Sequence, residues 1–380
     1  MFRRRGWGTM QDIDIGAVRL TAVWATFAIG FVLGAVMNRS HFCTMGAISD
    51  VLNLGSWTRM RMWLAAIGTA MAAVAVMAAA GLIDPGKALY ATPNFTWLSY
   101  VVGGFLFGFG MVLSSGCGSK TLVRIGGGSL KAVVTFIVLG LFAYMTLKGV
   151  FGVLRVNVLD PVALRLEPGQ DLPRLLANGD AGSLTAWRLW LGLGLGGALL
   201  AFALMDREFR RFDALAGSLV VGLCVAGVWY VSGHVAYVEE DPNTLQEAFV
   251  GTNSGRLEAL SFVAPVAYII ELLMFWSDTT KLVTIGIAAA LGVIAGSFAY
   301  AVATRSFRWE GFRDAEDTAN HLMGGALMGV GGVTALGCTV GQGLSGLSVL
   351  ALGSFVAFAA ILVGGVAAIR YQVWRIERMV

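Results

Sequence analysis

Three stretches of the sequence repeat one spacing of glycine and cysteine: GFVLGAVMNRSHFC at 30–43, GFLFGFGMVLSSGC at 104–117 and GALMGVGGVTALGC at 325–338. In each, a second glycine comes four residues after the first, and a cysteine comes nine residues after the second glycine. The chain has only 4 cysteines, and the remaining one, Cys224, lacks both glycines. Chance agreement of this kind is rare, so the sequence predicts an internal repeat built around a cysteine loop.

The composition around these motifs excludes a soluble globule. Of the 380 residues, 57% are hydrophobic and 13% are charged, and the mean hydropathy is +0.74. Soluble domains carry about 25% charged residues. We therefore expect an all-α polytopic protein embedded in the lipid bilayer, where helices satisfy their own backbone hydrogen bonds. The net charge of +4 and the 3 scattered histidines predict no nucleic-acid partner and no metal site, and we expect no cofactor.

Apolar stretches long enough to cross a bilayer, at roughly 20 residues each, are frequent in the chain. Nine of them span 17–37, 61–82, 97–113, 129–150, 184–205, 213–231, 281–303, 319–336 and 346–370. A tenth run, 258–277, includes a proline and a glutamate. Aligning the repeats places its segment SFVAPVAYI (261–269) on the loop around Cys43, with Ala264 in the cysteine position. We therefore predict about nine transmembrane helices plus four short re-entrant loop helices.

The repeat also predicts how the chain is divided. We expect a single membrane domain over 1–380, with half repeats at about 17–150 and 213–370 linked by 151–212. The two halves would have opposite topology and pseudo-twofold symmetry, an inverted repeat typical of transporters.

Basic residues predict the orientation of these halves. Nine crossings place the two ends of the chain on opposite sides, and the basic segments 206–213 and 305–313 fall on the same side as the C-terminal tail. The positive-inside rule makes that side cytoplasmic and leaves the N-terminus in the periplasm. The cluster Arg3–Arg5 opposes this assignment.

Each cysteine motif lies where an apolar helix meets a glycine-rich or polar loop, as in SSGCGSKTLVRIGGGS (114–129) and ALGCTVGQGLSGLS (335–348). Backbone amides freed by a broken helix need partners inside the protein or in a cavity. A half-helix that starts after the turn directs its positive end toward that cavity. The loops therefore predict an anion site near the middle of the bilayer.

Cysteine adds selectivity to such a site. A thiol is small, polarisable and both a weak donor and a weak acceptor, so Cys43, Cys117 and Cys338 suit a sulfur-bearing anion better than phosphate or a metal ion. We assign these three to substrate binding and expect no catalytic residue. Further residues assigned to the substrate path are Gly116, Gly118, Lys120, Gly337 and Thr339.

Several residues near the motifs have competing interpretations. Lys120 and Arg124 would either attract the anion or extend to the cytoplasmic interface. Glycine pairs such as Gly30 and Gly34 are read as helix packing, as is the pair at 325 and 329. The glycine run 126–128 is read instead as a loop that lines a path.

The loops NRSHFCTMGAISD (38–50), SSGCGSKTLVRIGGGS and ALGCTVGQGLSGLS resemble the cysteine-bearing loops of the YeeE/YedE sulfur-transport family, and the resemblance covers nearly the whole chain. Characterised members import thiosulfate across the bacterial inner membrane. The resemblance implies nine crossings, thiosulfate import, and a central constriction in which Cys43, Cys117 and Cys338 pass the anion on by weak S–H contacts. A soluble cytoplasmic sulfur-carrier protein is a candidate partner.

Alternatives stay open at this point. The long segments 151–183 and 236–257 depart from the family, which leaves transport of another sulfur or selenium species possible. A membrane thiol or sulfurtransferase-type redox protein is a second alternative, but the sequence has no C-x-x-C pair and no cysteine and histidine at the spacing of a catalytic pair. A third is a channel or chaperone-like subunit with structural cysteines. We expect a transporter rather than an enzyme, with Cys224 as a small apolar filler.

Overall fold

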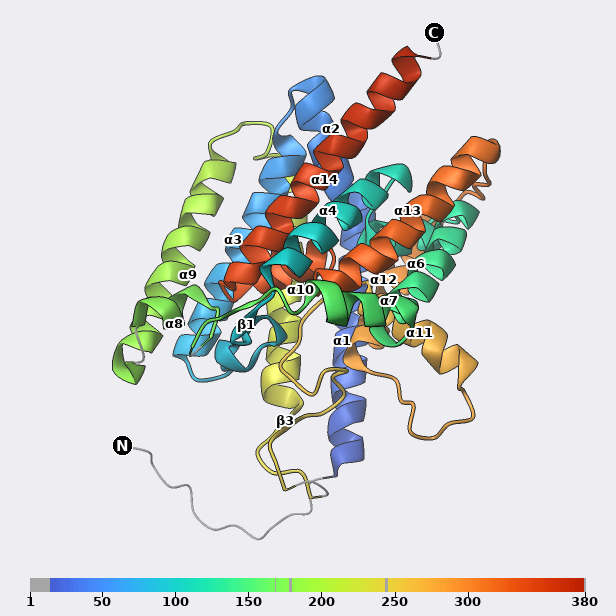
Figure 1. The fold of residues 1–380 in the computed structure, drawn as a ribbon. Helices are drawn as coiled ribbons and strands as arrows, with labels where there is room; N and C mark the ends of the chain where they lie inside the picture. Colours follow the sequence, from blue (N-terminus) through green and yellow to red (C-terminus); the bar gives the residue numbers. More distant parts are fainter. Residues whose placement is uncertain (1–13, 168, 178–179, 243–244, 379–380) are drawn as a thin grey trace.

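The computed structural model describes residues 14–167, 169–177, 180–242 and 245–378. This part of the chain is almost entirely helical (Figure 1). Its long helices are α1 (Ile15–Arg39), α3 (Thr58–Ala79), α4 (Trp97–Leu113), α6 (Leu130–Lys148), α9 (Ala181–Leu204), α10 (Phe212–Tyr230), α12 (Ile285–Ala303), α13 (Ala315–Thr334) and α14 (Leu352–Glu377). The cluster Arg3–Arg5 lies outside the described residues.

Shorter elements connect these helices. The short helices are α2 (Thr44–Ser49), α5 (Gly118–Gly126), α7 (Val150–Leu154), α8 (Leu172–Ala177) and α11 (Ala264–Met274). Helical turns of other types are η1 (Asp50–Leu54), η2 (Pro85–Lys87), η3 (Leu89–Ala91), η4 (Arg155–Leu159), η5 (Val231–Val235) and η6 (Gly341–Gly346). Strand β1 (Asn94–Phe95) pairs antiparallel with β2 (Leu164–Arg165), and β3 (Tyr237–Val238) pairs antiparallel with β4 (Ala248–Phe249).

Eight helical segments of the described chain are long and apolar enough to span a bilayer, which confirms the predicted polytopic all-α class. The remaining predicted stretch, 319–336, falls on α13, a helix of 20 residues. Polar side chains in its first turns, among them Glu316, Asp317 and His321, keep α13 outside that group of eight. The tenth run, 258–277, contains only the 11-residue helix α11, as the repeat argument predicted.

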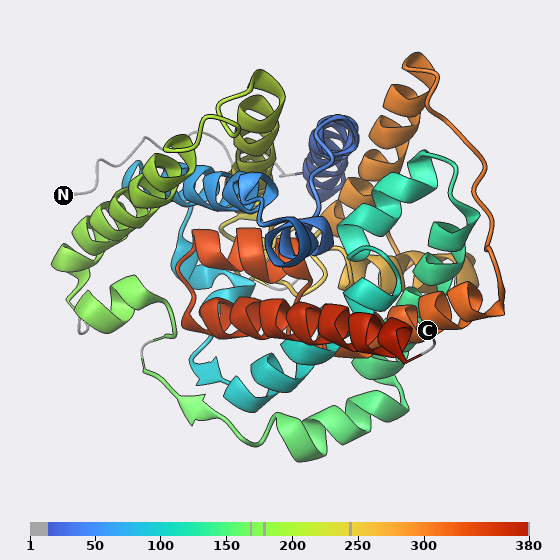
Figure 2. The same ribbon diagram turned by 90° about the horizontal axis from the view of Figure 1, so that it is seen from above.

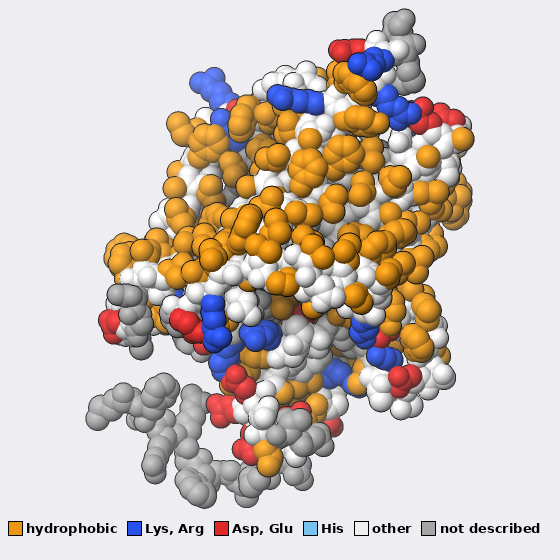
Figure 3. Space-filling view, viewed as in Figure 1, with side chains coloured by type: hydrophobic (Ala, Val, Ile, Leu, Met, Phe, Trp, Pro, Cys, Tyr) orange, Lys and Arg blue, Asp and Glu red, His pale blue; other side chains and the backbone are white. Residues whose placement is uncertain are grey.

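The surface shows where the bilayer would lie. On the face that Figure 3 shows, a broad apolar band crosses the middle of the molecule, and charged side chains gather at the two ends. Ion pairs Arg39–Asp213 and Arg375–Glu316 lie at the end where α14 finishes, and Lys87–Glu247 lies at the opposite end. Helix α1 begins at this second end, opposite to the end where α14 finishes (Figure 1).

Helix contacts pair up between the two halves of the chain. Helix α1 packs along α12 as α10 packs along α3, and α4 packs along α14 as α13 packs along α6. Helix α4 also packs against α13, whereas α9 lies at the edge beside α3 (Figure 2). A twofold relation between α1–α6 and α10–α14 requires this pattern. The contacts support the predicted inverted repeat, whose boundaries stay a prediction.

Glycines let these helices approach closely. A Cβ atom at Gly34 would lie 2.1 Å from the carbonyl oxygen of Val293 in α12, and one at Gly329 would lie 2.5 Å from that of Leu139 in α6. Small residues at such crossings permit backbone contact that larger side chains would prevent. The packing interpretation of the glycine pairs is therefore confirmed.

Candidate functional site

Each of the three motif cysteines follows the same backbone turn. The residue two positions before each cysteine has a left-handed conformation: φ is 50° at His41, 56° at Ser115 and 58° at Leu336. Left-handed residues end many helices, but the position usually holds glycine. The shared turn at three non-glycine residues shows that the motifs repeat in backbone geometry as well as in sequence.

Hydrogen bonds close this turn in the same way each time. The amide of the residue before each cysteine donates to a carbonyl five residues back, in the last turn of α1, α4 or α13. These bonds are Phe42 to Met37 at 3.3 Å, Gly116 to Met111 at 2.9 Å and Gly337 to Gly332 at 2.8 Å. The turn ends the preceding helix, and a short helix starts directly after each cysteine.

The three sulfur atoms lie at the N-termini of these short helices. The Sγ atoms of Cys43 and Cys338 each accept a hydrogen bond of 3.4 Å from the backbone amide three residues ahead. The Sγ of Cys117 lies 3.2 Å from the hydroxyl of Ser119. All three cysteines are free and buried, and Cys117 is within electrostatic range of both others. The structure thus brings the three predicted residues into one region.

The fourth motif differs from its predicted alignment by one residue. Helix α11 starts at Ala264, so Val263 takes the cap position that the cysteines occupy elsewhere. Ala264 therefore corresponds to the residue after the cysteine, and the predicted placement of Ala264 in the cysteine position is wrong. Pro265 explains the early start, because proline is favoured in the first turn of a helix.

Two threonines next to the cysteines were not both found by sequence reasoning. Thr44 follows Cys43 and Thr339 follows Cys338, and both side chains are buried. Neither hydroxyl has a hydrogen-bond partner among the described residues. A buried unpaired hydroxyl is costly, so both hydroxyls are available to hydrogen-bond a small polar molecule beside the cysteines. The equivalent positions of the two threonines in the repeat were the signal that could have identified Thr44.

The predicted path residues lie around these loops. Gly118 contacts the loop of the fourth motif, since a Cβ there would lie 2.8 Å from the carbonyl oxygen of Phe262. A Cβ at Gly116 would lie 3.1 Å from Cγ of Lys120, so the lysine stem covers this turn. Gly337 lines a cavity beside the Cys338 loop. The roles of these residues in binding stay a prediction.

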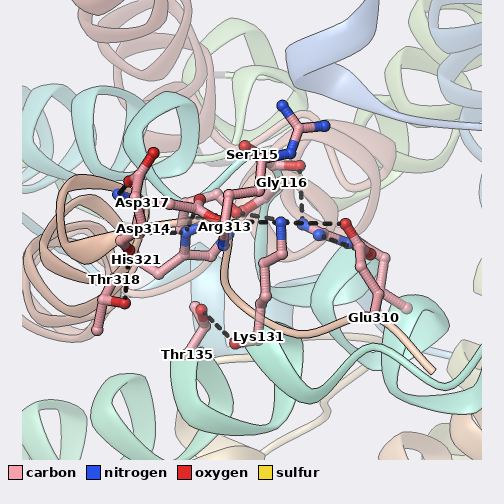
Figure 4. A network of polar contacts seen from close by, with 12 residues as sticks. Ser115, Gly116, Lys131, Thr135, Glu310, Arg313, Asp314, Asp317, Thr318 and His321 are labelled. Atoms are coloured by element: carbon pink, nitrogen blue, oxygen red, sulfur yellow. Dashed lines mark hydrogen bonds and ion pairs between the residues drawn. The ribbon is translucent and has the colours of Figure 1, made fainter.

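Arg124 pairs with Glu310, which belongs to a network of polar contacts with Lys131 and Asp317 (Figure 4). Its guanidinium donates to the carbonyl oxygens of Ser114 and Ser115 at 3.4 and 3.5 Å and lies 3.4 Å from the carboxylate of Glu310. Arg124 therefore ties the turn before Cys117 to the segment between α12 and α13.

The glycine run 126–128 ends helix α5 at this network. Gly128 has φ of 98°, and a Cβ there would lie 2.5 Å from the carbonyl oxygen of Arg308. The amides of Arg308 and Glu310 donate to the carbonyls of Gly127 and Gly128 at 3.1 and 3.2 Å. These contacts give the glycines a role in the turn and in packing, which the sequence interpretation as a path lining did not include.

A cavity of about 270 Å³ lies beside the Cys338 loop, at the end of the molecule opposite to the one where α14 finishes. Leu336 and Gly337, directly before the cysteine, form part of its wall, as does Ala264 of α11. Its ionisable lining residues are Tyr90, Arg155, Glu258 and Tyr268. The cavity can therefore hold a small polar molecule within reach of the third cysteine loop.

These features define a class of protein: a polytopic helical membrane protein whose helices break at buried thiols, as expected of a transporter. No group of three or more metal-binding side chains occurs in the described part of the chain.

The chain belongs to the sulphur transport family, whose sequence profile matches residues 39–367. This confirms the resemblance of the cysteine loops to the YeeE/YedE proteins. The thiosulfate transporter TsuA of Escherichia coli (strain K12) is 27% identical over 329 residues, which cover 83% of this chain and 84% of that protein. The thiosulfate transporter TsuA of Spirochaeta thermophila is 26% identical over 357 residues, 90% of this chain and 96% of that protein. The expectation of a transporter rather than an enzyme is thereby confirmed.

Proposed function

We propose that this protein imports thiosulfate across the bacterial inner membrane along a path formed at Cys43, Cys117 and Cys338. The observation that carries the proposal is the shared geometry of these residues: three buried sulfur atoms, each at the N-terminus of a short helix after the same turn. The names of the two relatives, which cover most of the chain at modest identity, support thiosulfate as the anion.

The chemistry of the site fits a small anion with one sulfur end and one oxygen end. Thiols donate weakly to a polarisable terminal sulfur, and helix N-termini favour negative charge. The free hydroxyls of Thr44 and Thr339 would donate to the oxygen atoms of the same anion. Weak neutral donors hold the anion without trapping it, which transport requires.

The proposal places the C-terminal end of α14 in the cytoplasm. The basic segments 206–213 and 305–313 lie at this end (Figure 1), and the last turns of α14 carry Arg370 and Arg375. The positive-inside rule favours that orientation. The cavity beside Cys338 would then open toward the periplasm, the side from which thiosulfate arrives.

Growth on thiosulfate tests this function. In a host that lacks its own thiosulfate and sulfate import, we expect the wild-type chain to restore growth with thiosulfate as the only sulfur source. Cys43→Ala, Cys117→Ala and Cys338→Ala should each abolish growth, whereas Cys224→Ala, a buried cysteine of α10 outside the motifs, should not. A wild-type chain that reaches the membrane but restores no growth would show that thiosulfate is not the cargo.

Competition distinguishes thiosulfate from other sulfur or selenium species. Sulfite, sulfate and selenite should compete poorly with labelled thiosulfate, because they lack its terminal sulfur. A soluble cytoplasmic sulfur-carrier protein stays a candidate receiver, and vesicles free of soluble protein would still take up thiosulfate if no receiver is needed.

A further inference from the structure

A second cavity, of about 490 Å³, lies beside α11 at the same end of the molecule as the cavity near Cys338. We call it the outer chamber. Its wall combines the first turns of α1, the end of α6, helix α11 and the segment before α12. The charged side chains in this wall are Arg19, Lys148, Glu271 and Lys281.

The charges of the outer chamber do not cancel. Both lysines pair with one oxygen of Glu271, at 2.9 Å for Lys148 and 2.8 Å for Lys281. Glu271 is buried, with 7% of its side chain exposed, and the two lysines remain 50% and 33% exposed. One carboxylate between two ammonium groups leaves a positive charge. Arg19 adds another, and it forms no ion pair with any other residue in the described ranges.

The outer chamber adjoins the cavity that reaches the Cys338 loop. Asn253 and Tyr268 line both spaces. We call the cavity of about 270 Å³ beside the Cys338 loop the inner cavity. From the shared wall it extends to Gly337, the residue directly before Cys338. An anion in the outer chamber would therefore lie beside Asn253 and Tyr268, which also line the cavity that leads to Cys338.

We propose that the outer chamber is a capture site for small divalent oxoanions, which it passes along Asn253 and Tyr268 toward Cys338. This inference rests on the proposed function, since it gives the transported sulfur anion its first binding site. A concave surface of one charge sign raises the local concentration of the opposite ion and speeds its association, and salt screens the effect. Glu271 keeps the site weak, because it already neutralises part of the lysine charge.

The test measures initial uptake of labelled thiosulfate by reconstituted protein at about 10 mM and about 200 mM salt, two conditions with very different screening. Lys281→Gln and Arg19→Gln should each raise the apparent KM about three- to tenfold at low salt. Lys281→Glu should raise it further, and Lys281→Arg should restore the wild-type value. The maximal rate should change little, and the differences should shrink at high salt.

Arg165→Gln is the matched control, because Arg165 is exposed at the same end of the molecule but does not line either cavity. An unchanged KM in the folded Lys281 and Arg19 variants at low salt would overturn the capture site. An equal rise in Arg165→Gln would also overturn it, by showing a general surface-charge effect. Loss of thiosulfate uptake by the wild-type protein itself would instead contradict the proposed function.

Discussion

Cys43 and Cys338 hold their sulfur atoms in the same way, although they lie in different halves of the chain. Each Sγ accepts a hydrogen bond of 3.4 Å from a backbone amide, that of Gly46 for Cys43 and that of Gly341 for Cys338. Each sulfur thus replaces the oxygen that usually caps a helix N-terminus. The bond fixes the sulfur at the positive end of a short helix, where an anion is favoured.

The unpaired hydroxyls beside these cysteines give the first prediction. Thr339→Val and Thr44→Val should reduce the efficiency of thiosulfate uptake about tenfold, which corresponds to one lost hydrogen bond of about 1.4 kcal/mol. Thermal stability should be unchanged or higher, because a buried unsatisfied group is removed. Paired uptake and melting measurements on each purified variant check both effects.

Thr146→Val is the control for these substitutions. The Thr146 hydroxyl is also buried, but it donates to the carbonyl of Phe142 at 2.7 Å within α6. This variant should keep its uptake efficiency. If the Thr44 and Thr339 variants lose stability and keep full uptake, their hydroxyls are structural and do not contact the anion.

Close helix packing gives a second prediction. A Cβ at Gly34 would lie 2.1 Å from the carbonyl oxygen of Val293, so Gly34→Ala should force α1 and α12 apart and destabilise the fold by about 1–3 kcal/mol. Gly194→Ala in α9 meets open space and should change stability by at most about 1 kcal/mol. Melting temperatures in detergent compare the two variants. Equal temperatures would refute close packing of α1 on α12.

The ion-pair network of Figure 4 gives a third prediction. Lys131 is buried, and its Nζ lies 3.2 Å from Glu310 and 3.0 Å from Asp317. Lys131→Met removes the partner that two partly exposed carboxylates share and should cost about 1.5–3 kcal/mol, the loss of hydrogen bonds to charged groups. Glu310→Gln affects a half-exposed carboxylate and should cost about 1 kcal/mol or less. Chemical denaturation of the two variants should give this order, and the reverse order would contradict it.

A fourth prediction concerns the pH dependence of the KM for thiosulfate, which we assign to Glu258 in the wall of the inner cavity. Burial raises the pKa of Glu258, although hydrogen bonds from Ser254 and Asn253 oppose the shift. As the outer pH falls toward this raised pKa, the carboxylate gains a proton and stops repelling the anion. The apparent KM for thiosulfate should therefore fall several-fold from neutral to acid pH, since thiosulfate itself stays fully ionised there.

Glu258→Gln isolates this effect. The variant should have a low KM that no longer depends on pH, because it removes the carboxylate whose protonation changes the charge of the cavity. KM measured against outer pH in both proteins checks the prediction. A variant that keeps the wild-type pH dependence would assign it to another group.

Glycine spacing and hydropathy were sufficient to predict most of the fold. The register of Cys43, Cys117 and Cys338 identified three places where a helix breaks and a short one begins, and the repeat reduced the run 258–277 to a short helix. These predictions succeeded because apolar length and glycine spacing are properties of local sequence.

Other features depend on contacts that no local pattern encodes. The left-handed turn at His41 and Leu336 uses residues that usually avoid this conformation, so no glycine marked it. The start of α11 at Ala264 follows from Pro265, which the cysteine alignment ignored. Arg124 was left between two roles, because its partner Glu310 lies far away in the sequence.

Uptake of labelled thiosulfate into vesicles that contain only this protein tests the central claim most directly. Wild-type protein and Cys224→Ala should accumulate thiosulfate at similar rates. Cys43→Ala, Cys117→Ala and Cys338→Ala should each reduce the rate to that of empty vesicles while they keep the wild-type melting temperature. Wild-type uptake by all three folded variants would contradict a path formed at these cysteines.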